Sequence, residues 1–325
     1  MPMPIPTPRY IQLHDMAAPL LVAEAVAGLQ ASQARLSPKF FYDTLGSRLF
    51  DAITELDEYY PTRTEAAIFR QHAASIADAV HGRVTRGATL VDLGAGNCVK
   101  AASLFDVLQP ARYVAVDISV EFLRDAIERL QQQRPAMEMI GVGLDFSSRL
   151  ALPAGLVQGP AVVFYPGSSI GNFSPDAALR LLREARAVAA DGALLIGVDL
   201  VKPQALLEAA YDDPLGVTAA FDLNLLRHLN RLIGSDFDLR QWRHVALFDT
   251  EQSRIEMHLE ARVALDVRWP GGERRFAAGE RIHTENSYKW QPQAFEALLH
   301  EAGYGRVQQW TDERGWFAVM LAQAG

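Results

Sequence analysis

Between residues 88 and 201 the chain alternates short apolar runs with longer amphipathic segments. The apolar runs are too short for buried helices and are rich in valine, leucine and isoleucine, so they predict buried strands. The segments between them have helical length, and strands that alternate with helices imply right-handed crossovers. The pattern therefore predicts an α/β fold with a doubly wound, mostly parallel sheet. Strands are expected at residues 88–93, 112–117, 137–144, 160–165 and 192–200, and helices after residue 94 and at 119–133 and 176–190.

The pattern changes on both sides of this region. Before it, helical periodicity is expected at residues 17–29, 47–56 and 64–80, with Pro61 as a helix breaker and Thr64 as a cap. After it, helical segments at 203–232, broken at 212–216, precede strand-like segments at 240–249, 254–266 and 281–290, a turn at 270–273, a helix at 292–302 and a strand at 316–322. We predict a loose tail at 1–8, a second α+β domain from 9–63 plus 202–288, and a sheet domain from 64–201 plus 289–325.

Composition narrows the classes of function. A chain of 325 residues is longer than one hydrophobic core usually supports, which predicts two domains or one elaborated domain. The content of 22% charged and 49% hydrophobic residues is typical of a globular protein. A formal net charge of -8 argues against a nucleic-acid partner, because phosphate binding depends on clustered Lys and Arg. Cys98 is the only cysteine, which excludes an intrachain disulfide or a cysteine zinc site and fits a reducing cytoplasm. No apolar run approaches the ~20 residues of a membrane helix, so we expect a cytoplasmic protein without a membrane or metal partner.

Ligands bind doubly wound sheets at the carboxyl ends of the strands. That rule places Gly94, Asp117, Asp145 and the loop PGSSIGN at 166–172 on one rim. The small residues of this loop allow a ligand close to the backbone, and Asn172 offers both a donor and an acceptor. A tight strand-to-helix connection with Asn172 capping the helix from residue 174 is an equally simple interpretation.

The segment VDLGAG at 91–96 resembles both a dinucleotide fingerprint and the first motif of S-adenosylmethionine (SAM) methyltransferases. A dinucleotide loop needs a third small residue to bring a pyrophosphate to the helix N-terminus. Val99 stands at that position, whereas SAM has no phosphate and needs only the space beside Gly94 and Gly96. This difference favours SAM over a nicotinamide cofactor.

Four further residues complete the predicted cofactor set. Lys100 can reach the methionine carboxylate of SAM, although a solvated surface lysine is the simpler interpretation. Asp117 is placed to accept hydrogen bonds from the ribose hydroxyls, as it also would in a dehydrogenase. Asp145 can accept from the adenine amino group, and Phe146 can supply a wall. The alternative for both aspartates is a turn at a strand end.

The chain also resembles a known family, the L-histidine Nα-methyltransferases of ergothioneine biosynthesis. The matching segments extend from about residue 37 to near the C-terminus: FYDTLGSRLF at 41–50, EYYPTRTE at 58–65, the loop at 92–96, PGSSIGN at 166–172, YDD at 211–213, RIEMHL at 254–259 and IHTENSYK at 282–289. The resemblance implies a Rossmann-like methyltransferase domain with a substrate-binding second domain. It also implies that SAM trimethylates the α-amine of L-histidine to give hercynine.

The resemblance implies roles at the amino-acid end of the substrate. Asn172 and Tyr211 would donate to its carboxylate, as amide and phenol groups can. Tyr59 and Gly167 would line the amine, and Tyr42 would lie beside the transferred methyl group. The amine must lose a proton before each transfer, and Tyr42, Tyr59 or water is the candidate acceptor.

The same resemblance implies the residues around the imidazole. Met257 would pack on the substrate, while Glu285 and Ser287 would bind the ring nitrogens, with Asn286 between them in the substrate-binding set. Glu285 and Ser287 are an i, i+2 pair on a predicted strand and therefore project from one face. His283 is expected on that face as well, without a catalytic role. Without the resemblance, a solvated strand face is the simpler interpretation of Glu285 and Ser287.

Three alternatives remain open. A relative could methylate another amino acid such as a tryptophan derivative, but an indole has one N–H and little use for both Glu285 and Ser287. An NAD-dependent oxidoreductase is disfavoured by Val99. A non-catalytic SAM-binding module would need an amine pocket that has lost its functional residues, whereas Tyr42, Asn172 and Tyr211 are all present. We expect a monomer that acts on a small molecule.

Overall fold

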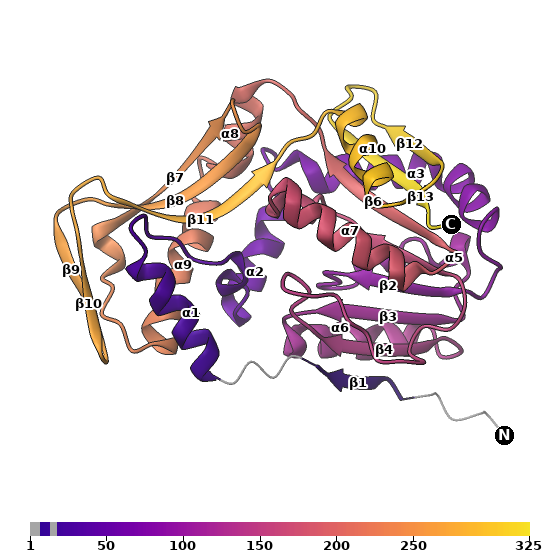
Figure 1. Cartoon of the computed structure of the whole chain (residues 1–325), viewed down its shortest axis with the longest axis horizontal. Coiled ribbons are helices and arrows are strands. Elements are labelled where there is room, and N and C mark those ends of the chain that lie inside the picture. Colours follow the sequence, from indigo (N-terminus) through magenta and orange to yellow (C-terminus); the bar gives the residue numbers. More distant parts are fainter. Residues whose placement is uncertain (1–6, 14–17) are drawn as a thin grey trace. The chain divides into compact units, whose positions relative to one another are not determined.

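The computed structural model describes residues 7–13 and 18–325, which form two compact units. The first, called here the sheet unit, consists of the described part of residues 1–14 together with 61–201 and 289–325. The second, the inserted unit, consists of the described part of residues 15–60 together with 202–288. Figure 1 shows the elements of both units along the chain.

An eight-stranded sheet forms the centre of the sheet unit, in the order β1-β4-β3-β2-β5-β6-β13-β12. All neighbouring pairs from β1 to β6 are parallel, and β13 and β12 add two antiparallel strands at the end. The chain leaves β2 in one direction towards β3 and β4, and later returns on its other side through β5 and β6. The ends of β2 and β5 therefore flank the topological switch point where such sheets bind ligands. The strands are β1 (Arg9–Gln12), β2 (Thr89–Leu93), β3 (Arg112–Asp117), β4 (Glu138–Gly143), β5 (Ala161–Tyr165), β6 (Ala193–Asp199), β12 (Val307–Thr311) and β13 (Phe317–Gln323).

Helices cover both faces of this sheet because its central strands are buried throughout. On one face, α7 and α10 contribute Leu182 and Phe295 to the core; on the other, α3 and α6 contribute Ile76 and Ile127. These observations confirm the predicted doubly wound α/β architecture. The helical segments are α3 (Tyr60–His81), α4 (Val99–Ala102), α5 (Phe105–Leu108), α6 (Val120–Gln133), η2 (Ser169–Asn172), α7 (Pro175–Ala189) and α10 (Pro292–Glu301).

The inserted unit is built around a three-stranded antiparallel sheet in the order β11-β8-β7, with β9 and β10 as a separate hairpin. Helices α8 and α9 pack on β7 and β8, and α2 packs on α9. The strands are β7 (Trp242–Asp249), β8 (Arg254–Ala261), β9 (Leu265–Trp269), β10 (Gly272–Phe276) and β11 (Arg281–Tyr288). The helices are α1 (Ala18–Gln30), η1 (Pro38–Phe41), α2 (Thr44–Thr54), α8 (Gln204–Tyr211), α9 (Val217–Leu232) and η3 (Leu239–Gln241).

Several predicted boundaries differ from the structure. The prediction that Pro61 breaks a helix is wrong, because α3 begins at Tyr60 and Pro61 lies in its first turn, where a missing N–H costs no hydrogen bond. The segment 9–12, predicted as part of the second domain, is instead a strand of the large sheet and pairs with β4. The strand predicted at 254–266 ends at Ala261, and the glycine loop at 94 opens two short helices rather than one.

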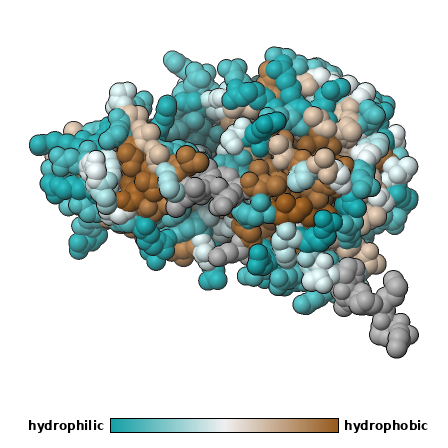
Figure 2. All heavy atoms as spheres, turned by 60° about the horizontal axis from the view of Figure 1, so that its bottom comes forward, coloured by the Kyte–Doolittle hydropathy of each residue, from teal (hydrophilic) through white to brown (hydrophobic). Residues whose placement is uncertain are grey.

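One face of the molecule carries mainly polar residues around hydrophobic patches (Figure 2). Among the described residues, no helix combines the length and the apolar character that a membrane crossing requires. Within the described ranges, the exposed large hydrophobic side chains are Leu13, Leu20, Leu45, Val99, Leu206, Leu215 and Val263.

Candidate active site

The loop after β2 is shaped by backbone conformations that favour glycine. Gly94 and Gly96 have φ angles of +69° and +51°, in the left-handed region. The N–H groups of Gly94 and Ala95 both donate to the carbonyl of Val116 on β3, at 2.9 and 3.1 Å. A Cβ atom at Gly94 would have nothing nearer than the Phe146 ring at 3.9 Å. The loop backbone thus stays open at the switch point, which fits a ligand such as SAM.

Asp117 ends β3 and turns its carboxylate towards this loop. Its Oδ2 accepts a hydrogen bond from Gly96 N at 2.9 Å, and its Oδ1 accepts from Ser119 N at 2.8 Å. Burial raises the pKa of Asp117, and these two backbone donors partly offset that effect. The predicted neighbours Gly96 and Asp117 are therefore in direct contact.

Asp145 and Phe146 follow β4, and their surroundings differ. The buried Asp145 accepts hydrogen bonds from the backbone and hydroxyl groups of Ser147, the backbone one at 3.0 Å, as a turn residue does. Phe146 lies edge-on to Tyr165 at 5.8 Å between ring centroids. Its ring is also the nearest group to the vacant side of Gly94. The structure thus brings the ends of β2, β4 and β5 together at Phe146.

Lys100 is held by Glu65, a residue for which no role was predicted. Its Nζ lies 2.7 Å from Oε2 of Glu65, whose side chain is 1% exposed. The other oxygen of Glu65 accepts a hydrogen bond from the backbone N–H of Gly167, also at 2.7 Å. One buried carboxylate on α3 therefore connects the predicted cofactor lysine to the Gly167 loop. Lys100 is consequently not the freely solvated lysine of the simpler interpretation.

The Gly167 loop turns sharply after β5. Gly167 and Ser168 have φ angles of +79° and +57°, and Ser168 Oγ accepts a hydrogen bond from Asp199 N at 2.8 Å. Asn172 ends η2 and does not cap the next helix. Ser174 does so, with its Oγ accepting from Ala177 N at 3.4 Å. The alternative in which Asn172 serves as that cap is wrong.

In the inserted unit, the three predicted tyrosines belong to one aromatic cluster. Tyr59 packs edge-on to Tyr211 at 6.1 Å and to Phe50 at 6.3 Å between ring centroids. Phe50 also contacts Tyr42 at 6.0 Å, and Tyr42 and Phe50 both contact Phe221. Phe50 has no predicted role, because nothing in its local pattern distinguishes it from the surrounding aromatic residues.

Tyr211 connects this cluster to the predicted imidazole-binding strand. Its hydroxyl lies 2.7 Å from Oγ of Ser287 on β11, and both side chains are buried. Glu285 is the register partner of Met257 on β8, so both residues belong to the same face as Ser287. The structure therefore gathers Met257, Glu285 and Ser287 on one buried face of the three-stranded sheet, and the Tyr211 phenol of α8 contacts this face at Ser287.

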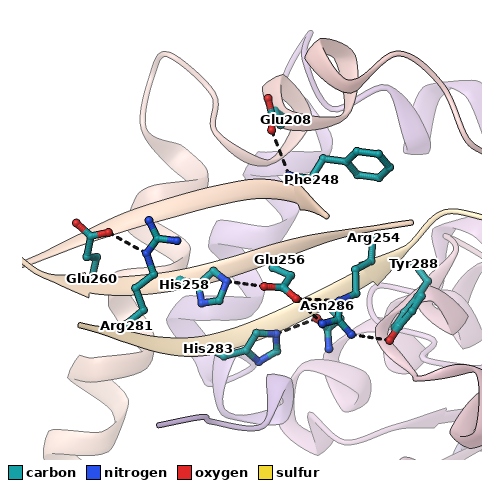
Figure 3. Close-up of polar contacts among 10 residues, drawn as sticks. All are labelled: Glu208, Phe248, Arg254, Glu256, His258, Glu260, Arg281, His283, Asn286 and Tyr288. Atoms are coloured by element: carbon teal, nitrogen blue, oxygen red, sulfur yellow. Dashed lines mark hydrogen bonds and ion pairs between the residues drawn. The ribbon is translucent and has the colours of Figure 1, made fainter. Parts of the chain in front are cut away.

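A β-bulge separates His283 and Asn286 from this face. The register changes between His283, which pairs with His258, and Glu285, which pairs with the adjacent Met257. His283 Nε2 lies 2.8 Å from Oδ1 of Asn286 (Figure 3). Asn286 follows Glu285 directly on β11, so the side chains of Asn286 and His283 point to the opposite side of the strand from Glu285. The expectation that His283 shares the face of Glu285 is wrong, and the structure does not bring the Asn286 side chain to Glu285 and Ser287.

Among residues 7–13 and 18–325, no group of three or more His, Cys, Asp and Glu side chains is arranged to hold a metal ion. The sheet unit instead offers an open glycine loop with a carboxylate and a cation beside it. The inserted unit offers buried phenol, hydroxyl and carboxylate groups with an aromatic wall.

Comparison with known proteins decides the family. The model of the histidine-specific, SAM-dependent methyltransferases matches residues 21–324. The chain belongs to this family. The chain is 41% identical to the histidine N-alpha-methyltransferase of Mycolicibacterium smegmatis, and the match covers 95% of this chain and 96% of that protein. The corresponding enzyme of Mycobacterium tuberculosis is also 41% identical, over 92% of this chain and 93% of its own.

A fungal relative extends the comparison. Ergothioneine biosynthesis protein 1 of Neurospora crassa is 31% identical over 89% of this chain, which matches 33% of that longer protein. As a member of the histidine-specific family, the protein is a SAM-dependent methyltransferase, and the open loop at Gly94 and Gly96 fits that donor. The predicted SAM cofactor and the predicted enzyme class are confirmed.

Proposed function

We propose that this protein trimethylates the α-amine of L-histidine with SAM and produces hercynine, the first step of ergothioneine biosynthesis. Family membership and two relatives at 41% identity support this function. The structural observation that carries it is that Glu285 and Ser287 are buried on one face of the inserted unit's sheet, with the buried Tyr211 phenol in contact with Ser287. A carboxylate and a hydroxyl on one face suit a ring with two nitrogens, one that donates a hydrogen bond and one that accepts or donates.

Each methyl transfer is an in-line displacement. The neutral amine uses its lone pair to form a bond to the methyl carbon, the carbon–sulfur bond breaks, and S-adenosylhomocysteine leaves. The ammonium of histidine loses a proton before the first transfer, and each methylated ammonium loses one before the next. The third transfer gives a quaternary nitrogen that has no proton left to lose, so the reaction ends there. Positioning supplies much of the rate enhancement in such a reaction.

In the proposed substrate set, Glu285 accepts from an imidazole N–H and Ser287 binds the other nitrogen. Met257 packs on the substrate, and its buried position beside Glu285 supports that role. Tyr211 donates to the substrate carboxylate. The contact between its hydroxyl and Ser287 supports a role for the phenol in the same binding site.

The remaining residues of the substrate set concern the carboxylate and the amine. Asn172 joins Tyr211 as a carboxylate donor, and Gly167 offers its backbone near the amine. Tyr59 and Tyr42 line the amine as members of the aromatic cluster. Tyr42, Tyr59 or water accepts the protons.

For SAM, Asp117 is proposed to bind the ribose hydroxyls and Lys100 the methionine carboxylate. The hydrogen bond from Gly96 to Asp117 supports the first role, because it holds the carboxylate at the loop. Gly94 and Gly96 leave room for the donor, while Asp145 accepts from the adenine amino group and Phe146 lies against the ring. SAM supplies an electrophilic methyl group on a sulfonium.

The substrate assignment is tested by incubating the purified protein with SAM and a panel of amino acids and weighing the products. The expected result is mono-, di- and trimethylated histidine and no methylated tryptophan or tyrosine. Preferential methylation of tryptophan or a tryptophan derivative would show that this member of the family acts on another amino acid and would reject the histidine assignment. SAM binding without methylation of any amino acid would identify a non-catalytic module.

We also propose that the protein works as a cytoplasmic monomer without a nucleic-acid partner. The single cysteine, Cys98, fits a reducing compartment, and the net charge of -8 argues against a nucleic-acid partner. Light scattering coupled to size exclusion measures the oligomeric state, and a dimer mass would contradict the proposal.

A further inference from the structure

His244 contacts the backbone of Tyr211, one of the proposed substrate residues, and both of its ring nitrogens have hydrogen-bond partners. It belongs to β7, and its Nδ1 lies 2.6 Å from Oδ2 of Asp222 on α9. Its Nε2 lies 2.8 Å from the backbone carbonyl oxygen of Tyr211, the last residue of α8. The side chains of His244 and Asp222 are 1% and 0% exposed. His244 therefore joins three elements of the inserted unit inside its core.

The number of protons in this arrangement follows from the partners. A carbonyl oxygen can only accept, so Nε2 must carry a proton that points at Tyr211. The short contact between Nδ1 and the Asp222 carboxylate needs a second proton. The usual distribution of these two protons is an imidazolium beside a carboxylate. The His244–Asp222 pair therefore keeps both of its hydrogen bonds only while it holds two protons.

The charges around the ring agree with this count. Burial opposes the charged form of His244, but the hydrogen bond and charge of Asp222, the Tyr211 carbonyl and Asp212 more than offset it, so the pKa of His244 is raised. From β8, the register partner of His244 is the uncharged Leu259. A cation at this position also suits the end of α8, where helix carbonyls lack partners and the dipole is negative.

We infer that His244, bridging Asp222 and the Tyr211 carbonyl, is a positioning residue that holds the Tyr211 phenol beside Ser287 for the substrate. The inference rests on the proposed role of Tyr211 in binding the substrate carboxylate. His244 itself contacts neither substrate nor donor in this assignment. It fixes the end of α8, and the Tyr211 side chain leaves the backbone at that point to meet Ser287 at 2.7 Å. Loss of His244 therefore affects amino-acid binding through Tyr211.

The chain offers a matched control on the other face of the same sheet. His258 on β8 is also buried, and its Nε2 lies 2.9 Å from Oε2 of Glu256 (Figure 3). This second histidine–carboxylate pair faces away from Glu285 and Ser287. His258→Phe removes a comparable pair from the same sheet without a link to Tyr211.

The test compares the steady-state kinetics of His244→Phe, Asp222→Asn and His258→Phe in the full chain. His244→Phe is expected to raise the KM for histidine about tenfold, as for the loss of one charge-assisted hydrogen bond, with the KM for SAM little changed. Asp222→Asn keeps both contacts, because its amide can donate to Nδ1 of a neutral ring whose Nε2–H still reaches Tyr211. Its KM for histidine should stay within about threefold of wild type. His258→Phe should leave both constants unchanged.

Two measurements keep the inference separate from the proposed function. Nitrogen NMR of ring-labelled protein should show both nitrogens of His244 protonated at neutral pH in the wild type and one in Asp222→Asn. If another amino acid proves to be the substrate, the histidine assignment fails, and the same KM comparison is made with that substrate. Equal effects of His244→Phe and His258→Phe on folded protein, or equal changes in the KM values for amino acid and SAM, would overturn the positioning role. A folded Asp222→Asn variant as impaired as His244→Phe would overturn it too.

Discussion

Glu65 and Lys100 form an ion pair, 2.7 Å between Oε2 and Nζ, in which the carboxylate is almost fully buried. The second oxygen of Glu65 receives the Gly167 N–H, so the pair leaves neither oxygen of the carboxylate unbonded. A buried charge is tolerated only with such partners. Glu65 therefore fixes two predicted ligand-binding segments of the sheet unit at once.

Replacing Glu65 should impair SAM binding. Glu65→Gln keeps an acceptor for Gly167 but removes the charge that holds Lys100, and we expect the Kd for SAM to rise about tenfold, from the loss of about 1.4 kcal/mol. Glu65→Ala should in addition destabilise the fold by about 3 kcal/mol, because it leaves two partners unsatisfied. Calorimetric SAM titration and thermal unfolding measure the two effects. The control is Asp106→Asn, which breaks the exposed pair with Arg134 and should change neither. Unchanged SAM affinity in Glu65→Gln would exclude the role of Glu65.

Gly197 tests the same contact from the opposite side. A Cβ atom on Gly197 of β6 would lie 2.0 Å from Oε1 of Glu65 and 3.1 Å from Gly167 N. Gly197→Ala should therefore displace Glu65, destabilise the protein by about 2 kcal/mol and weaken SAM binding. Gly305→Ala is the control, since its Cβ would meet only ordinary contacts at 3.5 Å or more. If the Gly197→Ala variant binds SAM with the affinity of the wild type, the position of Glu65 beside Gly197 is not required for SAM binding.

The sequence predicted the sheet well because its central strands are buried on both faces. The apolar run predicted at 112–117 coincides with β3, and the polar residue that ends it, Asp117, contacts the glycine loop as its position on the rim implied. β1 was missed because it has only four residues and lies at the sheet edge, where the apolar signal is weak. Local pattern thus predicts strands in proportion to their burial.

The site was only partly predictable for a related reason. Glu65 occupies the apolar face of α3, with the buried Ile68 and Phe69 three and four positions later, and a carboxylate at such a position was a usable signal. His244 gave no local signal, because its partner Asp222 lies on another element. The bulge after His283 also depends on the register with β8, which alternation along one strand cannot reveal.

The two faces of β11 predict opposite results for neighbouring residues. Glu285→Gln and Ser287→Ala should each raise the KM for histidine about tenfold or more, because each removes a proposed partner of the imidazole. Asn286→Ala should change it less than about threefold, since that side chain bonds to His283 on the other face. Steady-state kinetics with histidine varied at saturating SAM measure all three. A large effect of Asn286→Ala on the KM for histidine, in a variant of normal thermal stability, would show that Asn286 takes part in substrate binding.

Asp43 predicts how the stability of the inserted unit depends on acid. It caps α2, where its Oδ1 accepts from Gly46 N at 2.7 Å and from Asn224 Nδ2 at 2.8 Å. Burial raises the pKa of Asp43, but these hydrogen bonds, with the charges of His228 and Arg231, lower it overall. The folded carboxyl therefore has a lower pKa than the unfolded one.

The stabilisation by Asp43 is complete above the unfolded pKa of about 3.9 and is lost as the pH falls through the lower folded value. Asp43→Ala should cost about 1–2 kcal/mol at pH 7, as for other helix caps. The difference from wild type should shrink as the pH is lowered below about 4. Urea unfolding at a series of pH values measures it. Ser174→Ala is the matched control, because it removes an uncharged cap from α7, and its cost should not depend on pH. A pH-independent cost of Asp43→Ala would show that the charge of Asp43 contributes nothing to the cap.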